Sequence, residues 1–222
     1  MKRFASEHSL GLVSFGLFLV VWIGGQSVAG HRTYNEEQRA HGESEISYGA
    51  YLTSAHFGEA TFENWESEFL QMGGYVMLTV FLRQKGSAES SPLDGEEPSD
   101  EPPEGHESDP DAPWPVRRGG WVLSIYKNSL SLGFILLFLL TFALHAATGA
   151  REYSNEQAAH GGAAVTAVQY LSRSQFWFES MQNWQSEFLA VAAIVVLSVY
   201  LRQKGSPESK AVHAPHSETG SS

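Results

Sequence analysis

Apolar residues of this chain are concentrated in four runs that polar stretches separate. Two of the runs, Leu10–Val28 and Leu130–Ala147, contain no Asp, Glu, Lys or Arg over 18 residues or more. A helix of that length crosses about 30 Å of hydrocarbon. Both runs therefore predict transmembrane helices, although the mean hydropathy of the whole chain, -0.21, is typical of a soluble protein.

The other two apolar runs are shorter. Phe69–Leu82 and Phe188–Leu201 have 14 residues each, or about 21 Å of helix. A crossing requires each helix to begin earlier, near Phe62 and near Met181, because about 20 residues are needed. Four helices are thus predicted, over about 10–28, 62–82, 123–147 and 181–201.

The two halves of the chain are related by an internal repeat. Asn64–Leu70 returns 119 residues later as Asn183–Leu189, and at the same offset Gly30–Ser90 aligns with Gly149–Ser209 without a gap, with 28 identities in 61 positions. One membrane topology must therefore satisfy both halves.

Basic residues predict that topology. Clusters lie before the first and third helices and after the second and fourth: Lys2 and Arg3; Arg117, Arg118 and Lys127; Arg83 and Lys85; Arg202 and Lys204. With four crossings all clusters fall on one side, which is the cytoplasm by the positive-inside rule. Both termini and the linker between the halves are then cytoplasmic. The first run also fits a signal peptide ending at Ala29, but its equivalent lies mid-chain, so we expect no cleavage.

We therefore expect an all-α integral membrane four-helix protein made of two parallel-oriented helical hairpin repeats, with interfacial helices on the outer side. Aromatic residues between the helices of each hairpin predict the interfacial helices: Tyr48, Tyr51, Leu52 and Phe57, then Tyr170, Leu171, Phe176, Trp177 and Phe178. The predicted domains are the first hairpin 1–85, a linker 86–120, the second hairpin 121–204 and a tail 205–222.

Charge is concentrated in the linker. Ten carboxylates lie in Glu89–Asp111, and the formal net charge of the chain is -11. Residues 86–120 and 205–222 are too poor in apolar residues to form a core and predict disorder. The charge balance excludes a basic nucleic-acid surface, and the absence of cysteine excludes disulfides and thiolate metal sites.

One polar constellation follows the first helix of each half. Glu37 and His41 recur as Glu156 and His160, and a helix with Asn35 or Ser154 as N-cap would place each pair one turn apart. Two carboxylates and two imidazoles meeting at the repeat axis would suffice to bind a divalent metal. A surface pair is the simpler interpretation, and we favour it because Glu-x-x-x-His has little specificity.

A second constellation lies at the start of the short apolar runs. It comprises Asn64, Ser67 and Glu68 in the first half and Asn183, Ser186 and Glu187 in the second. Their spacing places each trio on one stripe of a helix. The stripe serves either as a proton or cation site with Glu68 facing Glu187, or as packing contacts in which each glutamate pairs with Arg32 or Arg151. We favour packing.

The motifs Tyr34–Gly42, Tyr51–Ser54, Phe62–Gln71 and Arg83–Ser90 resemble a family of small bacterial membrane proteins defined only as a domain of unknown function. The resemblance implies a protein of the bacterial plasma membrane and brings no catalytic residue or cofactor. No Walker loop, Gly-x-Ser-x-Gly elbow, dinucleotide fingerprint or zinc-protease motif is present in the sequence.

We therefore expect a non-enzymatic envelope protein, structural or partner-binding, without a cofactor. Its expected partners are the lipid bilayer and either a second copy or another membrane protein, and no nucleic acid. A small channel or transporter using Glu68 and Glu187 is the first alternative. A metal-binding membrane enzyme using Glu37, His41, Glu156 and His160 is the second.

Overall fold

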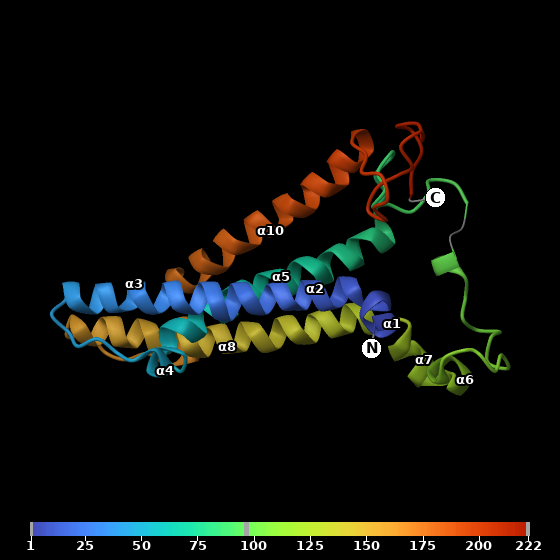
Figure 1. Cartoon of the computed structure of the whole chain (residues 1–222). Helices are drawn as coiled ribbons and strands as arrows, with labels where there is room; N and C mark the ends of the chain where they lie inside the picture. Colours follow the sequence, from blue (N-terminus) through green and yellow to red (C-terminus); the bar gives the residue numbers. More distant parts are fainter. Residues whose placement is uncertain (1, 96–97, 221–222) are drawn as a thin grey trace. The chain divides into compact units, whose positions relative to one another are not determined.

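Helices occupy all four stretches that the apolar runs predict. The computed structural model describes residues 2–95 and 98–220, and these residues contain no strand, which confirms the all-α class. Glu96 and Glu97 of the predicted linker and the last two residues of the predicted tail lie outside the described residues. The longest helices are α5 (Ala55–Phe81), α8 (Ser129–Ala159) and α10 (Ser174–Tyr200), drawn in Figure 1.

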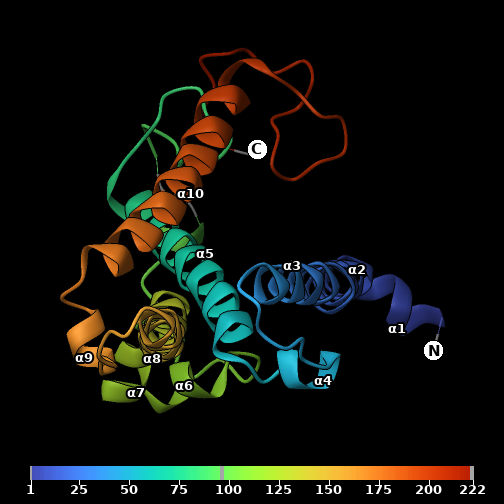
Figure 2. The same ribbon diagram turned by 90° about the vertical axis from the view of Figure 1, so that its left-hand side faces the viewer.

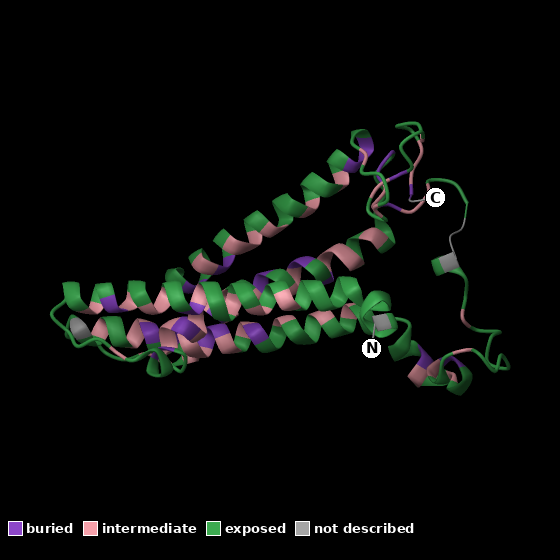
Figure 3. Cartoon of the chain, viewed as in Figure 1, coloured by how far each residue is buried: buried purple, intermediate pink, exposed green. Residues whose placement is uncertain are grey.

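The first apolar run belongs to a longer helical rod. After α1 (Lys2–Glu7), the helices α2 (Ser9–Leu19), η1 (Val20–Gln26) and α3 (Ser27–Ala40) follow one another end to end, and η1 is a π-helix (Figure 1). The rod extends 12 residues past Val28 because strong helix formers, among them Glu36–Ala40, fill its polar end. Figure 3 shows that exposed residues predominate along α2, whose side chains are almost all apolar.

Three helices of the described residues are long and apolar enough to span a membrane: Ser9–Ala40, Ser129–Ala158 and Ser174–Tyr200. The helix α5 has the same length as α10, 27 residues or about 40 Å, but is not among them. Its first half carries Glu59, Glu63, Glu66 and Glu68, whereas the equivalent part of α10 carries fewer carboxylates.

The chain divides into two compact units. The first comprises the residues up to Thr61 together with Leu144–Ser172, and the second comprises Phe62–Ala143 and Arg173–Ser222. Each unit therefore combines parts of both sequence halves.

In the first unit, two tyrosines related by the 119-residue offset form the core. Tyr51 is 1% exposed and Tyr170 is fully buried. Each packs on the backbone of a glycine: a Cβ on Gly30 would overlap Tyr51 Oη, and a Cβ on Gly149 would lie 2.5 Å from Tyr170 Cε1. These close approaches account for both glycines, which lie inside the helices α3 and α8.

The two tyrosines end short helices. These are α4 (Tyr48–Tyr51) and α9 (Ala167–Tyr170), in the stretches where aromatic residues predict them. Ser47 and Thr166, again 119 residues apart, are the N-caps, and their hydroxyl oxygens accept hydrogen bonds from the backbone N–H groups of Ala50 and Gln169.

In the second unit, glycines of α5 allow close approach of phenylalanines from α8 and α10. A Cβ on Gly73 would lie 3.0 Å from Phe134 of α8, and one on Gly74 would lie 3.6 Å from Phe188 of α10. Close approach at small residues is the usual packing of transmembrane helices. Further along, the ring of Phe142 meets Phe176 edge to face, with ring centroids 5.1 Å apart.

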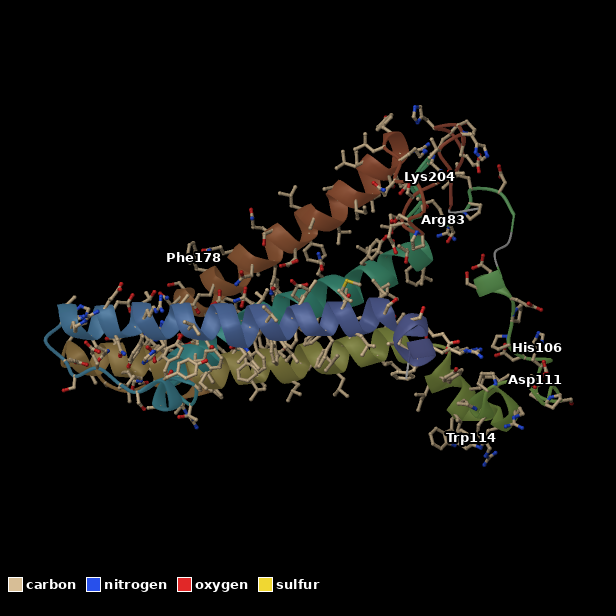
Figure 4. All side chains as sticks on the ribbon, viewed as in Figure 1. Arg83, His106, Asp111, Trp114, Phe178 and Lys204 are labelled. Atoms are coloured by element: carbon tan, nitrogen blue, oxygen red, sulfur yellow. The ribbon has the colours of Figure 1, made fainter. Side chains whose placement is uncertain are left out.

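The helices α5 and α10 end in the same way, near the positions of Arg83 and Lys204 in Figure 4. Arg83 donates through Nη1 to three carbonyls of the last turn of α5, and Arg202 does the same at the end of α10. The residue after each arginine, Gln84 or Gln203, donates its backbone N–H to the hydroxyl of a serine six residues further on, Ser90 or Ser209. The repeated motif is therefore a helix C-cap.

The described part of the acidic linker forms turns and the single turn η2 (Pro98–Asp100). It is followed by α6 (Trp114–Arg118) and α7 (Gly120–Tyr126), which lead into α8. The tail folds back in turns, and Lys210, 2% exposed, donates to the carbonyls of Pro215, His216 and Glu218.

Candidate functional site

The first unit contains a cavity of about 1030 Å³. It lies where the polar ends of α3 and α8 and the first turns of α5 present their side chains. The titratable carboxylates and imidazoles of its wall are Glu37, Glu43, Glu59, Glu152 and Glu156, with His41, His56 and His160. No Lys or Arg is among the described residues that line it.

The cavity brings together all four residues of the first predicted constellation. Glu37 and His41 lie one turn apart at the end of α3, and Glu156 and His160 lie in the same relation at the end of α8. All four are exposed. Because Glu37 follows Val28 by nine residues, it lies about 13 Å along the helix beyond the apolar run.

The predicted N-caps of these segments were wrong. Asn35 and Ser154 lie inside α3 and α8, which run on without interruption from the apolar runs. Their side chains instead fasten the returning loops: Asn35 Oδ1 accepts from the backbone N–H of Ile46 at 2.9 Å, and Ser154 Oγ accepts from that of Val165 at 2.9 Å. Side chains of Asn and Ser that bond to the backbone can start a helix, whereas here they close a loop.

Two further wall residues are positioned by the core tyrosines. Tyr51 Oη and His56 Nδ1 are hydrogen-bonded at 3.1 Å, and Tyr170 Oη donates to Glu59 Oε1 at 3.3 Å. The sequence did not point to His56 or Glu59, because neither recurs at the 119-residue offset, where Gln175 and Phe178 stand. The only sequence feature that could have pointed to them is the recurrence of Tyr51 and Tyr170, the tyrosines to which they are hydrogen-bonded.

Glu152 is the most buried carboxylate of the wall, with 8% of its surface exposed. Asn155 Nδ2 donates to it at 3.3 Å, and Glu37, Glu156 and His56 lie within electrostatic range. Burial raises the pKa of the Tyr51 phenol to about 12, and the carboxylates of Glu152 and Glu37 add to that effect. The cavity is therefore a region of negative potential that favours cations.

The wall does not form a compact metal centre. Among the described residues that line the cavity, no three carboxylates or imidazoles bring ligand atoms within 4.8 Å of one another. Zinc and other transition metals require donors about 2 Å from one ion. The geometry instead suits a larger ligand whose positive charges are spread out.

Arg32 and Arg151 do not line this cavity, and within their own unit neither is in an ion pair with a described carboxylate. Both are exposed. Their predicted pairing with Glu68 and Glu187 stays a prediction.

The second constellation lies in the second unit. Glu68 is exposed, Glu187 is half-buried and the two are within electrostatic range. Ser67 and Ser186 donate within their own helices, to the carbonyls of Asn64 and Asn183. Asn183 also donates through Nδ2 to Glu63.

The polar contacts between α5 and α10 come mainly from residues that the sequence did not single out. Glu66 is fully buried and accepts a hydrogen bond from Ser180 Oγ at 2.8 Å. Gln71 Nε2 donates to the backbone carbonyl of Glu187 at 2.9 Å. Glu66 was missed because its equivalent is Gln185, so a search for charge retained in both halves passes over it.

A family model described as a domain of unknown function (DUF6766) matches residues 1–221. No curated protein and no solved structure matches the chain.

Proposed function

The chain belongs to the DUF6766 family, and we propose that it is a non-enzymatic integral membrane protein of the bacterial plasma membrane that binds multiply charged organic cations. The observation that carries the proposal is the cavity of about 1030 Å³, with its five glutamates, three histidines and no lining Lys or Arg among the described residues. Such a volume is that of a site for an organic ligand rather than for a single ion.

The proposed topology has four crossings. Three helices meet the length and apolarity for a membrane span, and α5 is long enough to be the fourth. In this arrangement both termini and the linker are cytoplasmic, as the basic clusters indicate. The cavity is then on the opposite, outer face, with Glu37 of its wall about 13 Å beyond the apolar run of its own helix.

Electrostatics supports a polyvalent cation. A positive charge beside one exposed carboxylate gains only up to about 1 kcal/mol, so strong binding needs several carboxylates. Because the carboxylates are spread around the wall, one ion cannot approach them all, whereas a linear polyamine can contact several at once. Tyr34 adds an aromatic face to the wall, and aromatic rings attract ammonium groups.

The second constellation supports a structural role rather than an ion path. Ser67 and Ser186 satisfy their hydroxyls within their own helices. Aromatic rings pack around the same level of the second unit, where Phe138 lies edge to face with Trp184. The proposal therefore gives Glu68 and Glu187 no transport role.

The test is equilibrium binding of spermidine to the purified full chain in detergent, by calorimetry, with Glu37→Gln and Glu36→Gln as a matched pair. Both residues are exposed on α3, but only Glu37 lines the cavity. One exposed ion pair is worth up to about 1 kcal/mol, so we expect Glu37→Gln to weaken binding about fivefold and Glu36→Gln to leave it unchanged.

Equal effects of the two substitutions, or no binding of spermidine by the parent protein, would contradict the proposal. Binding of Zn²⁺ that excludes spermidine and is lost in His41→Ala and His160→Ala would favour a metal site instead.

A further inference from the structure

The residues between the acidic linker and α8 form two short helices, which we call the juxtamembrane segment (residues 114–127). It consists of α6 and α7, joined at Gly119 and Gly120, whose φ angles are 65° and 59°. Residues with a Cβ rarely adopt such φ angles, so the two glycines permit the break between α6 and α7. Val116 of α6 and Leu123 of α7 are buried, and Val116 lines a pocket together with Pro102, Pro103 and His106 of the linker.

The largest apolar side chains of the juxtamembrane segment are exposed. Trp114 is 61% exposed and Trp121 is 73% exposed, and Ile125 and Tyr126 are also exposed. Figure 4 shows Trp114 directed away from α6. Val116 and Leu123 are the buried apolar residues of the segment, and these four exposed side chains remain able to contact another surface.

The same segment is basic. Arg117 and Arg118 form the last turn of α6, and Lys127 follows α7. Trp and Tyr beside Lys and Arg are the residues that gather at the headgroup level of membranes. The polar and apolar groups of the segment therefore match the two layers of a lipid interface.

We propose that the juxtamembrane segment docks on anionic phospholipid headgroups of the bilayer that holds α8. The helix α8 begins at Ser129, two residues after Lys127, so the segment is tethered within about 7 Å of a helix apolar enough to span the membrane. In Figures 1 and 2, α6 and α7 lie at the end of α8 where that helix begins. The arginines and Lys127 bind phosphates, and Trp114, Trp121 and Ile125 enter the acyl boundary.

The acidic linker competes with the lipid for the basic residues. Lys127 Nζ donates to Glu104 Oε1 at 2.7 Å, and both side chains are about half exposed. The linker carries ten carboxylates between Glu89 and Asp111, so it supplies an intramolecular substitute for anionic headgroups. Docking then depends on the anionic lipid content of the membrane, which sets the balance between headgroups and linker.

The chain contains no cysteine, so one introduced thiol reports on the segment alone. Ile125→Cys labelled with the environment-sensitive dye NBD places the probe at an exposed apolar position. The full chain is reconstituted in nanodiscs of phosphatidylcholine with and without phosphatidylglycerol. Blue-shifted emission and quenching by brominated acyl chains measure the docked fraction.

We expect phosphatidylglycerol to increase docking and high salt to reverse the increase. A basic residue near an anionic surface contributes about fivefold, so Arg117→Gln with Arg118→Gln should lower the ratio of docked to undocked segment about thirtyfold. The control, Lys85→Gln with Lys204→Gln, removes the same charge at exposed positions after α5 and α10 and should have no effect. Glu104→Gln should increase docking at a given lipid composition.

Equal emission and quenching in the two lipid compositions would overturn the proposal. So would equal losses in the arginine variant and the lysine control. Both comparisons use the whole chain in a bilayer. The comparison of the two lipid compositions uses the labelled protein without any charge substitution, so its result does not depend on whether the charge variants fold.

Discussion

Substitution of Gly30 by alanine tests whether the glycine–tyrosine contacts organise the cavity. The added Cβ would overlap Tyr51 Oη and lie 3.0 Å from Tyr51 Cζ. Tyr51 is 1% exposed, so its ring has no space into which to move freely. The hydroxyl that would be displaced is the one bonded to His56 Nδ1.

Two opposing effects determine the magnitude. Forcing an extra methyl into a packed site costs about 1–3 kcal/mol, whereas alanine in place of glycine inside a helix gains about 1 kcal/mol. We therefore expect Gly30→Ala to destabilise the protein by about 1 kcal/mol net. Gly49→Ala is the control. Gly49 is also helical and lies two residues from Tyr51, but it is open to solvent, and an added Cβ would meet no atom within 4 Å. This control should gain stability.

The assay is thermal unfolding of the purified full chain in detergent. The two alanine variants should differ by about 2 kcal/mol, which corresponds to about 4–8 °C in Tm for a chain of this size. Tyr51→Phe removes the atom that clashes, so Gly30→Ala should cost less in that background. A Gly30→Ala variant as stable as Gly49→Ala, with no coupling to Tyr51→Phe, would refute the reasoning.

Two further predictions concern the second unit. Ser180→Ala removes the hydroxyl that donates to the buried Glu66, so the stability should fall by about 1–2 kcal/mol and Tm by about 2–8 °C. Ser186→Ala, at an exposed position, should change Tm little, and equal Tm values for the two variants would contradict this. Burial raises the pKa of Glu89, and the nearby carboxylate of Glu208 raises it further. The hydrogen bond that Tyr75 donates opposes this shift. Because the pKa is raised in the folded state, protonation of Glu89 favours folding. The stability that comes from the bound proton is present below the ordinary carboxyl pKa and is lost as pH rises through the higher folded value. Glu89→Gln should therefore raise Tm at pH 7 and change it less at pH 4, and a pH-independent effect in thermal scans would count against the shift.

The sequence was sufficient to predict the helices because their signal is local. Absence of charge over the length of a bilayer identifies a spanning helix without knowledge of its neighbours, and α8 and the rod that includes α2 follow from it. The recurring pairs Glu37–His41 and Glu156–His160 were also found, because a repeat at a fixed offset marks positions that both halves keep. The structure places both pairs in the wall of one cavity.

The contacts across helices could not be read from the sequence. Glu59, His56, Glu66 and Gln71 lie at positions where the halves differ, and their partners are mostly distant in the chain, as in the bond from Ser180 to Glu66. The role of Asn35 was misread because the same side chain can cap a helix or close a loop.

The sequence by itself determined where the helices lie and which residues recur, since both are properties of neighbouring residues and of a fixed spacing. Only the tertiary structure decided that Tyr51 and Tyr170 position His56 and Glu59, and that these residues share a cavity wall with Glu37 and Glu156. The reason is physical: packing between segments far apart in the chain sets side-chain distances, and local propensity carries no information about those distances.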